Sequence, residues 1–295
     1  MNGPRAQAPQ PHRFYDGGSD TEPPDPARPF QIVVEREVEG GAERFRMLRR
    51  IAYLDDEYGE ILVPEDLATF RTDFASVPDL FTWLVPKTGN HLPPALVHDG
   101  LINPGGPATY ISTEGHVIDR ADADRVFRAG MRDAHVPLVR RWLVWSAVTL
   151  GTIWSGSADW SRGTHLRYRL AMLGTLGVVV VLGVLATLDL LDVVDWVPWM
   201  GDRPFLVELA GGAAGAVVIP LLLGLTWGRF RIAGVIAGIA LALLLHVTVV
   251  LVGITLLYKV AEHLAVRRPL ALLVATGTVV ASCAVFTALL VGTRW

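Results

Sequence analysis

Four long apolar segments in the C-terminal half of the chain constrain its fold more than any other feature of the sequence. They run over Leu170–Leu188, Phe205–Trp227, Ile232–Tyr258 and Leu270–Val291. Roughly 20 helical residues span a hydrocarbon core about 30 Å thick, so each segment is long enough to cross a bilayer. The sequence therefore predicts an all-α membrane domain over residues 161–295 with four transmembrane helices.

The preceding part of the chain has the composition of a soluble protein. Hydrophobic residues make up 51% of the whole chain and charged residues 19%, with a mean hydropathy of +0.38. These averages combine a polar part up to about Trp160 with an apolar part from Leu170 onward. Residues 1–28 are rich in Pro, Gly, Asp and Gln, so we expect a disordered tail there and no signal peptide. Residues 29–160 are expected to form the soluble domain.

Net charge and cysteine content narrow the class of protein further. The net charge is −3, and no block of Lys and Arg resembles a phosphate-binding stripe. We therefore expect no nucleic-acid partner. Cys283 is the single cysteine, which excludes an intrachain disulfide and is compatible with a reducing compartment for the soluble part.

The charges that flank the apolar segments bear on orientation. Arginines precede the first segment and separate the second from the third, namely Arg162, Arg167, Arg169, Arg229 and Arg231. The positive-inside rule then places the soluble domain in the cytoplasm. The loop after the third apolar segment argues for the opposite orientation. It carries Lys259, Arg267 and Arg268, which would face outward if the soluble domain is cytoplasmic.

Glycines and two ionisable residues mark the apolar segments themselves. Gly211 and Gly215, like Gly234 and Gly238, have the spacing that allows close helix packing and could support a homo-oligomer, although glycine-rich membrane helices also show it. Glu208 and His246 could line the polar path of a transporter or channel. Neither residue belongs to a repeated or paired pattern, so we favour an anchor or assembly module.

The soluble part has the pattern of an α+β domain. Phe30–Val38 and Glu43–Asp55 flank Gly40-Gly41, which predicts a hairpin, and Gly59–Pro64 predicts another short strand. Together they indicate a small antiparallel sheet. Three helices are expected to follow, over Leu92–Asn103, Asp119–Ala134 and Leu138–Thr152.

A His-Asp dipeptide lies within the first of these helices. His98 has Ala95, Leu101 and Ile102 on its own helical face, so its side chain is expected to point inward. On the next helix, Asp124 shares a face with apolar residues. A buried carboxylate is costly unless it is paired, and we expect it to pair with His98. The pair could orient His98 as a general base or simply hold the two helices together.

Two more carboxylates could bind a cation. Asp99 points about 100° away from His98 around the helix and could supply oxygen ligands to calcium. Asp73 could add a second ligand, or it could form a turn beside the Ser-x-Pro sequence. A His-Asp metal phosphohydrolase is an alternative, for which His91 is the only further histidine nearby. A zinc protease is not supported, because no His-Glu-x-x-His sequence occurs.

The stretches "RTDFASVPDLFTWLVP", "PPALVHDGLI" and "DRADADRVFRAGM" together resemble a family of bacterial and phage proteins filed as domain of unknown function 1353. The resemblance covers about residues 30–155 and none of the membrane part. The shared positions are Thr72, Asp73, Ala75, Ser76, Pro78, Ala95, His98, Asp99, Arg120, Ala123, Asp124, Phe127 and Met131. Ala95 stands one residue closer to the histidine than in the family pattern, and Gly100 and Ile102 replace common tyrosines.

The two helices of that family are similar to those of phospholipase A2, particularly the short prokaryotic form. The resemblance implies that His98 activates water, that Asp124 orients the His98 ring and that Asp99 binds a calcium cofactor. The disulfides and the glycine-rich calcium loop of phospholipase A2 are absent here. Ser76 could act as a nucleophile instead, but no Gly-x-Ser-x-Gly elbow surrounds it.

These observations lead to two main hypotheses. The first is a membrane-anchored, phospholipase-like hydrolase of the bacterial inner membrane that acts on lipid esters, with the bilayer and its phospholipids as partners. The second is a non-catalytic, phage-derived membrane module in which His98 and Asp124 form a structural pair.

Overall fold

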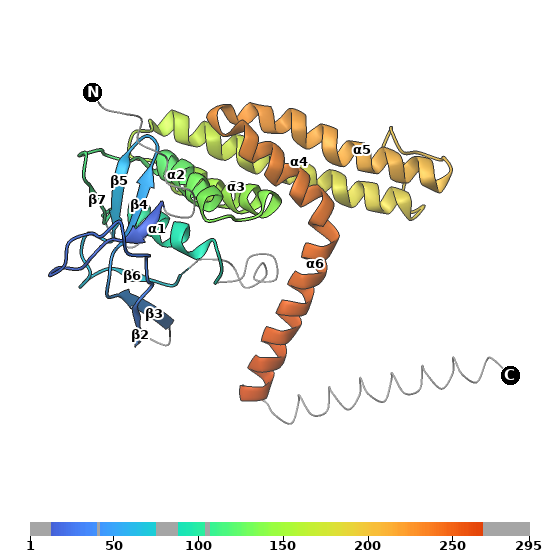
Figure 1. Cartoon of the computed structure of the whole chain (residues 1–295). Coiled ribbons are helices and arrows are strands. Elements are labelled where there is room, and N and C mark those ends of the chain that lie inside the picture. The colour runs from blue at the N-terminus through green and yellow to red at the C-terminus, as the bar shows by residue number, and fades with distance from the viewer. Residues whose placement is uncertain (1–12, 40–41, 75–87, 104–106, 268–295) are drawn as a thin grey trace. The chain divides into compact units, whose positions relative to one another are not determined.

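The computed structural model of the chain describes residues 13–39, 42–74, 88–103 and 107–267 (Figure 1). It divides into two units, residues 1–243 and 244–295. The first unit contains the sheets, the helices that carry His98 and Asp124, and the apolar helices up to residue 243. The second unit begins within the last described helix.

The larger sheet has four antiparallel strands in the order β1-β4-β5-β7. The strands are β1 (Phe14–Asp16), β4 (Ile51–Asp55), β5 (Gly59–Val63) and β7 (Ile111–Ser112). A tight turn joins β4 to β5, where Asp55 Oδ1 accepts hydrogen bonds from the backbone N–H groups of Glu57 and Tyr58. The predicted strand at Gly59–Pro64 is thus confirmed as β5.

The second sheet has the order β2-β3-β6. It contains β2 (Val34–Glu39), β3 (Ala42–Met47) and β6 (Arg71–Thr72). Antiparallel pairing of β2 with β3 confirms the predicted hairpin. The predicted continuous strand Glu43–Asp55 is wrong, because the chain leaves one sheet after Met47 and enters the other at Ile51. The two segments pair with different neighbours, which sequence periodicity does not reveal.

The prediction of a disordered tail over residues 1–28 is wrong from residue 13 onward. Strand β1 pairs with β4, and Phe14 and Tyr15 are buried. Asp16 is 3% exposed and accepts hydrogen bonds from Arg49, Arg28 and the N–H group of Gly18. Three buried residues and this ion-pair network outweigh the Pro- and Gly-rich composition around them. Residues 1–12 lie outside the described residues.

Three helices complete the soluble part, and all three predictions are confirmed to within a few residues. Helix α1 spans Leu92–Ile102, α2 spans Arg120–Asp133 and α3 spans Leu138–Ser155. Asp119 caps α2 as expected, since its carboxylate accepts from the N–H group of Asp122 at 2.7 Å. In Figure 1, α1 and α2 lie against the larger sheet, and α3 follows α2.

Gly100 explains how closely α1 approaches the sheet. A Cβ atom at this position would lie 2.2 Å from Cγ1 of Val63 on β5 and 3.0 Å from the carbonyl oxygen of Thr109. A side chain therefore has no space here. This glycine lets helix α1, and with it His98, lie directly on β5.

Two helical stretches are long and apolar enough to cross a membrane, Arg162–Leu190 and Phe205–Val247. The first is α4 (Arg162–Leu190). The second contains α5 (Phe205–Gly224), the 3-10 segment η2 (Leu225–Phe230) and the start of α6 (Arg231–Arg267). Gly228 breaks this second stretch with φ 60° and ψ −119°. Two such stretches are thus observed, whereas the complete set of four spans stays a prediction. Leu270–Val291 lies outside the described residues.

The four spaced glycines contact parts of their own chain. Cβ atoms at Gly211 and Gly215 would lie 2.6 and 2.9 Å from the carbonyl oxygen and ring nitrogen of Trp199, respectively. At Gly238 a Cβ atom would lie 2.8 Å from Pro220 on α5. Close packing against a neighbouring helix is thus observed at Gly238, whereas Gly211 and Gly215 pack against Trp199 in the turn before α5. A homo-oligomer through these glycines stays a prediction.

Candidate active site

His98 and Asp124 are brought together by the packing of α1 against α2. His98 Nε2 lies 2.9 Å from Asp124 Oδ1, which is hydrogen-bond distance. The two residues are 6% and 2% exposed. The pairing predicted from the helical faces is therefore present, and it is shielded from bulk water.

The surroundings of the pair are apolar. The ring of Phe127, one turn after Asp124 on α2, lies 5.1 Å from the imidazole ring. Asp124 Oδ2 is buried and has no hydrogen-bond partner within the described ranges. His98 is thus the hydrogen-bonding partner of this carboxylate, and an apolar neighbourhood strengthens the interaction between them.

This arrangement has a direct consequence for proton transfer. When Nε2–H donates to the Asp124 carboxylate, the other ring nitrogen, Nδ1, carries the lone pair. Asp124 then holds the ring in one orientation and would stabilise the imidazolium formed when Nδ1 takes a proton. A His98–Asp124 pair with a purely structural role would make the same hydrogen bond.

Asp99 is half-buried and points to strand β6 instead of α2. Its Oδ2 accepts a hydrogen bond from the Thr72 hydroxyl at 2.8 Å, and that hydroxyl accepts from the N–H group of Phe74 at 2.9 Å. Burial raises the pKa of Asp99 to about 6, and the negative charge of Asp73 adds to this shift. The neighbouring His98 and the Thr72 hydroxyl act in the opposite direction. Asp73 and Asp99 therefore form an adjacent pair of carboxylates.

Asp73 and Asp99 supply fewer oxygen ligands than calcium requires. Calcium takes six to eight oxygen ligands, usually with several carboxylates. Within the part of the chain that the structure describes, no group of three or more His, Cys, Asp or Glu residues could hold a metal ion. The two carboxylates are too few to form such a site alone.

Thr72 and Asp133 make hydrogen bonds that the sequence did not indicate. Thr72 belongs to the motif shared with the family, but its hydrogen bond to Asp99 depends on where β6 meets α1. Asp133 is the last residue of α2 and is fully buried. Its carboxylate accepts hydrogen bonds from the Tyr53 hydroxyl at 2.9 Å and from Arg132 Nε at 2.9 Å. This second buried network is separate from His98.

His91 and Glu208 lie elsewhere in the described structure. His91 is buried at the N-terminal end of α1, seven residues before His98. Ser76 lies outside the described residues, so its proposed role as a nucleophile is untested. Glu208 is 5% exposed and accepts from the N–H group of Arg203 at 2.9 Å, which is a local contact at the start of α5.

Comparison with known protein families gives a match within the soluble part. Residues 45–148 match the family model described as "Protein of unknown function (DUF1353)". The match contains α1, α2 and the strands that support them. No curated protein and no solved structure matches the chain.

Proposed function

We propose, from the match of residues 45–148 to the DUF1353 family model, that this chain is a membrane-anchored hydrolase that cleaves a lipid ester. The observation that carries the proposal is the 2.9 Å contact between His98 Nε2 and Asp124 Oδ1. The family description names no activity, so the chemistry is argued from the residues. The similarity of the two helices to those of phospholipase A2 is part of this proposal.

In the proposed reaction, His98 acts as the general base. Nδ1 takes a proton from water while the water oxygen attacks the ester carbonyl carbon, and Asp124 stabilises the imidazolium through Nε2–H. When the tetrahedral intermediate collapses, the ester C–O bond breaks and the imidazolium returns its proton to the leaving alkoxide oxygen. The products are a carboxylic acid and an alcohol, which for a phospholipid are a fatty acid and a lysophospholipid.

Calcium remains a prediction for Asp99 and Asp73. Two adjacent carboxylates, one with its pKa raised to about 6, form a site where a cation would relieve repulsion. An assay with and without calcium tests this cofactor independently of the base.

The exposed surface of the apolar helices supports a membrane position. Core helices of soluble proteins are mostly buried, whereas only 17% of the apolar window in α4 and 28% of that in Phe205–Val247 are buried here. Leu170, Val181 and Leu206 are 61%, 58% and 75% exposed. A lipid bilayer would cover such surface. We propose the bacterial inner membrane with the soluble part in the cytoplasm, and a tether of this kind raises the effective concentration of lipid substrate.

Fatty-acid release by the purified full-length protein in mixed phospholipid–detergent micelles tests the proposed activity. His98→Gln should lower the rate by about 10²–10⁴, the usual contribution of a general base. Asp124→Asn should also lower it, because the amide no longer stabilises an imidazolium. Asp133→Asn is the matched control, since it alters an equally buried carboxylate of the same helix that is separate from His98. Activity that survives His98→Gln unchanged would exclude the mechanism.

A second function is favoured by the burial of the pair. Residues that are 6% and 2% exposed are typical of a structural interaction between helices. The chain would then be a non-catalytic membrane module, which the sequence hypothesis relates to phages. It predicts that His98→Gln lowers the free energy of unfolding as much as Asp133→Asn does, and that the unmodified protein releases no fatty acid.

A further inference from the structure

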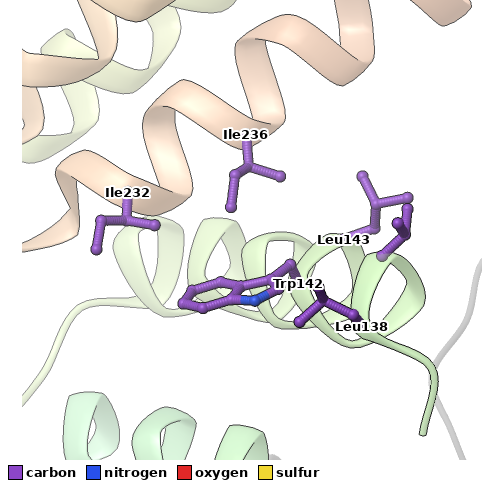
Figure 2. A pocket seen from close by; sticks show the side chains of 6 residues that line it. Leu138, Trp142, Leu143, Ile232 and Ile236 are labelled. Atoms are coloured by element: carbon purple, nitrogen blue, oxygen red, sulfur yellow. The ribbon is translucent and has the colours of Figure 1, made fainter.

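Helix α3 has two kinds of neighbour. On one side, Leu138 of α3 lies across an apolar pocket from Ile232 and Ile236 of α6 (Figure 2). The residues that line this pocket are all hydrophobic. On another side, α3 packs against α2, the helix that carries Asp124. The interface with α2, and not the pocket, is thus where α3 bears on the proposed catalytic pair.

The contact between Arg128 and Trp145 sets the register of α2 against α3. The guanidinium carbon of Arg128 lies 4.7 Å from the centroid of the Trp145 ring. Only residues 134–137 separate the two helices, and near their other ends Ala121 and Ile153 belong to one buried cluster. The helices therefore run antiparallel. A residue one turn before Arg128 is then level with a residue one turn after Trp145.

Asp124 and Thr149 occupy these two positions. Asp124 comes four residues before Arg128, and Thr149 comes four residues after Trp145. Four residues are about one helical turn, so each lies on the same helical face as the contact that sets the register. The two residues are 2% and 0% exposed. A carboxylate and a hydroxyl group thus lie at the same level of the buried interface between α2 and α3.

Both residues carry a buried polar atom without a partner. Asp124 Oδ1 lies 2.9 Å from His98 Nε2, but Asp124 Oδ2 and Thr149 Oγ1 make no hydrogen bond to any residue that the structure describes. Trp145 Nε1 is a third buried atom in this condition. Buried polar groups are costly unless they are hydrogen-bonded. One acceptor and two donors at the same helix interface therefore require a shared partner.

The Thr149 hydroxyl group is not used by its own helix. Ser146, Thr187 and Thr255 each donate to the carbonyl oxygen four residues earlier, at 2.8, 2.7 and 2.8 Å. Serine and threonine within helices often make this bond. Thr149 makes no such bond to the carbonyl oxygen of Trp145. Its hydroxyl group is therefore available to a partner outside α3.

We propose that one water molecule binds between α2 and α3, where it donates a hydrogen bond to Asp124 Oδ2 and accepts one from the Thr149 hydroxyl group. Buried water typically makes about three hydrogen bonds to polar groups that otherwise lack partners, and Trp145 Nε1–H supplies the third. Thr149 is then a positioning residue, because through the water it fixes the carboxylate that orients the His98 ring. This positioning role rests on the proposed hydrolase, whereas the water site does not.

Urea unfolding of the full-length protein in detergent tests the water site without any activity. Thr149→Val keeps the shape of the side chain and removes the hydroxyl group. If the water joins that group to Asp124, Thr149→Val should raise the equilibrium constant of unfolding about 10-fold, the effect of one lost hydrogen bond. If the hydroxyl group is buried without a partner, valine should leave stability unchanged or increase it. That result would overturn the proposal.

A double-mutant cycle with Asp124→Asn identifies the partner of Thr149. Hydrogen bonds to a charged group are stronger than those to a neutral amide, so Thr149→Val should raise the unfolding constant less in Asp124→Asn than in the unmodified protein. Thr152→Val is the matched control. It removes a hydroxyl group that is 1% exposed, about one turn further along α3, and its effect should be the same in both backgrounds. Equal effects of Thr149→Val in both backgrounds would exclude the water bridge.

Fatty-acid release distinguishes positioning from a structural role. Thr149→Val should lower kcat about 10-fold and leave KM unchanged, because the buried hydroxyl group does not contact substrate. Thr149→Ser keeps the hydroxyl group and should restore both kcat and stability. An unchanged kcat in Thr149→Val, or a loss that Thr149→Ser does not restore, would overturn the positioning role. If the two substitutions are coupled but the unmodified protein releases no fatty acid, the hydrolase proposal fails while the water site stands.

Discussion

Replacement of Asp99 by asparagine should stabilise the soluble part at neutral pH. The pKa of Asp99 is raised from 3.8 to about 6, mainly by burial and additionally by the charge of Asp73. The folded state therefore holds this proton more tightly than the unfolded state. The favourable contribution is fully present below pH 3.8 and is lost as pH rises through 6. Above that pH, ionised Asp99 costs the folded state up to about 3 kcal/mol, at about 1.4 kcal/mol per pH unit.

Asparagine removes the charge and keeps an oxygen that accepts the Thr72 hydrogen bond. Because Asp99 is only half-buried, solvent screens part of the effect, and we expect Asp99→Asn to add about 1–3 kcal/mol to the free energy of unfolding at pH 7.5. The gain should disappear near pH 4, where the carboxyl group is protonated.

Urea unfolding of the full-length protein in detergent and a calcium chelator, followed by near-ultraviolet circular dichroism, measures this difference between pH 4 and 8. Asp159→Asn, which alters an exposed carboxylate, is the control and should change little at any pH. A loss of stability in Asp99→Asn at pH 7.5, or a gain that does not depend on pH, would refute the reasoning. If calcium binds at Asp99, added calcium should stabilise the unmodified protein more than Asp99→Asn.

Three further predictions concern packing and buried charge. Gly100→Ala should lower the free energy of unfolding by about 1–3 kcal/mol, because the new Cβ would overlap Val63. Thermal unfolding measures this loss, and an unchanged unfolding temperature would mean that α1 shifts to make room for the new atom. Burial opposes ionisation of Asp16, but hydrogen bonds led by Arg49 outweigh it and lower the pKa of Asp16. Its stabilising contribution should thus be lost as pH falls through its ordinary pKa toward the lower folded value, and Asp16→Asn should show a smaller loss of stability between pH 6 and 3. Tyr53→Phe removes the donor to a buried carboxylate and should cost about 1–3 kcal/mol in urea unfolding, whereas a neutral effect would mean that the neighbouring arginines suffice.

Much of the local structure follows from the sequence alone. The prolines at Pro93 and Pro94, the cap at Asp119 and the apolar periodicity of α2 predict helices at nearly the observed bounds. Helical periodicity also predicts that His98 and Asp124 face inward, and a buried carboxylate needs a partner. The apolar segments Leu170–Leu188, Phe205–Trp227 and Ile232–Tyr258 similarly predict helices. The structure has helices there over Arg162–Leu190, Phe205–Gly224 and Arg231–Arg267. In each case the determining interaction lies within a few residues along the chain.

Long-range pairing decided the rest. The buried strand at Phe14–Asp16 depends on β4 and on Arg49, 33 residues away from Asp16. Composition could not reveal that pairing. Similarly, the chain changes sheets between Met47 and Ile51 because the strands before and after this turn pair with different neighbours. Strand β3 pairs with β2 and β6, whereas β4 pairs with β1 and β5.

The candidate site also depends partly on the local sequence and partly on long-range packing. The sequence determined that a histidine and an aspartate on neighbouring helices would share a buried face. Only the tertiary structure decided that the contact runs through Nε2 at 2.9 Å and that Thr72 reaches Asp99. Such contacts join residues far apart in sequence, and their geometry depends on how whole elements pack.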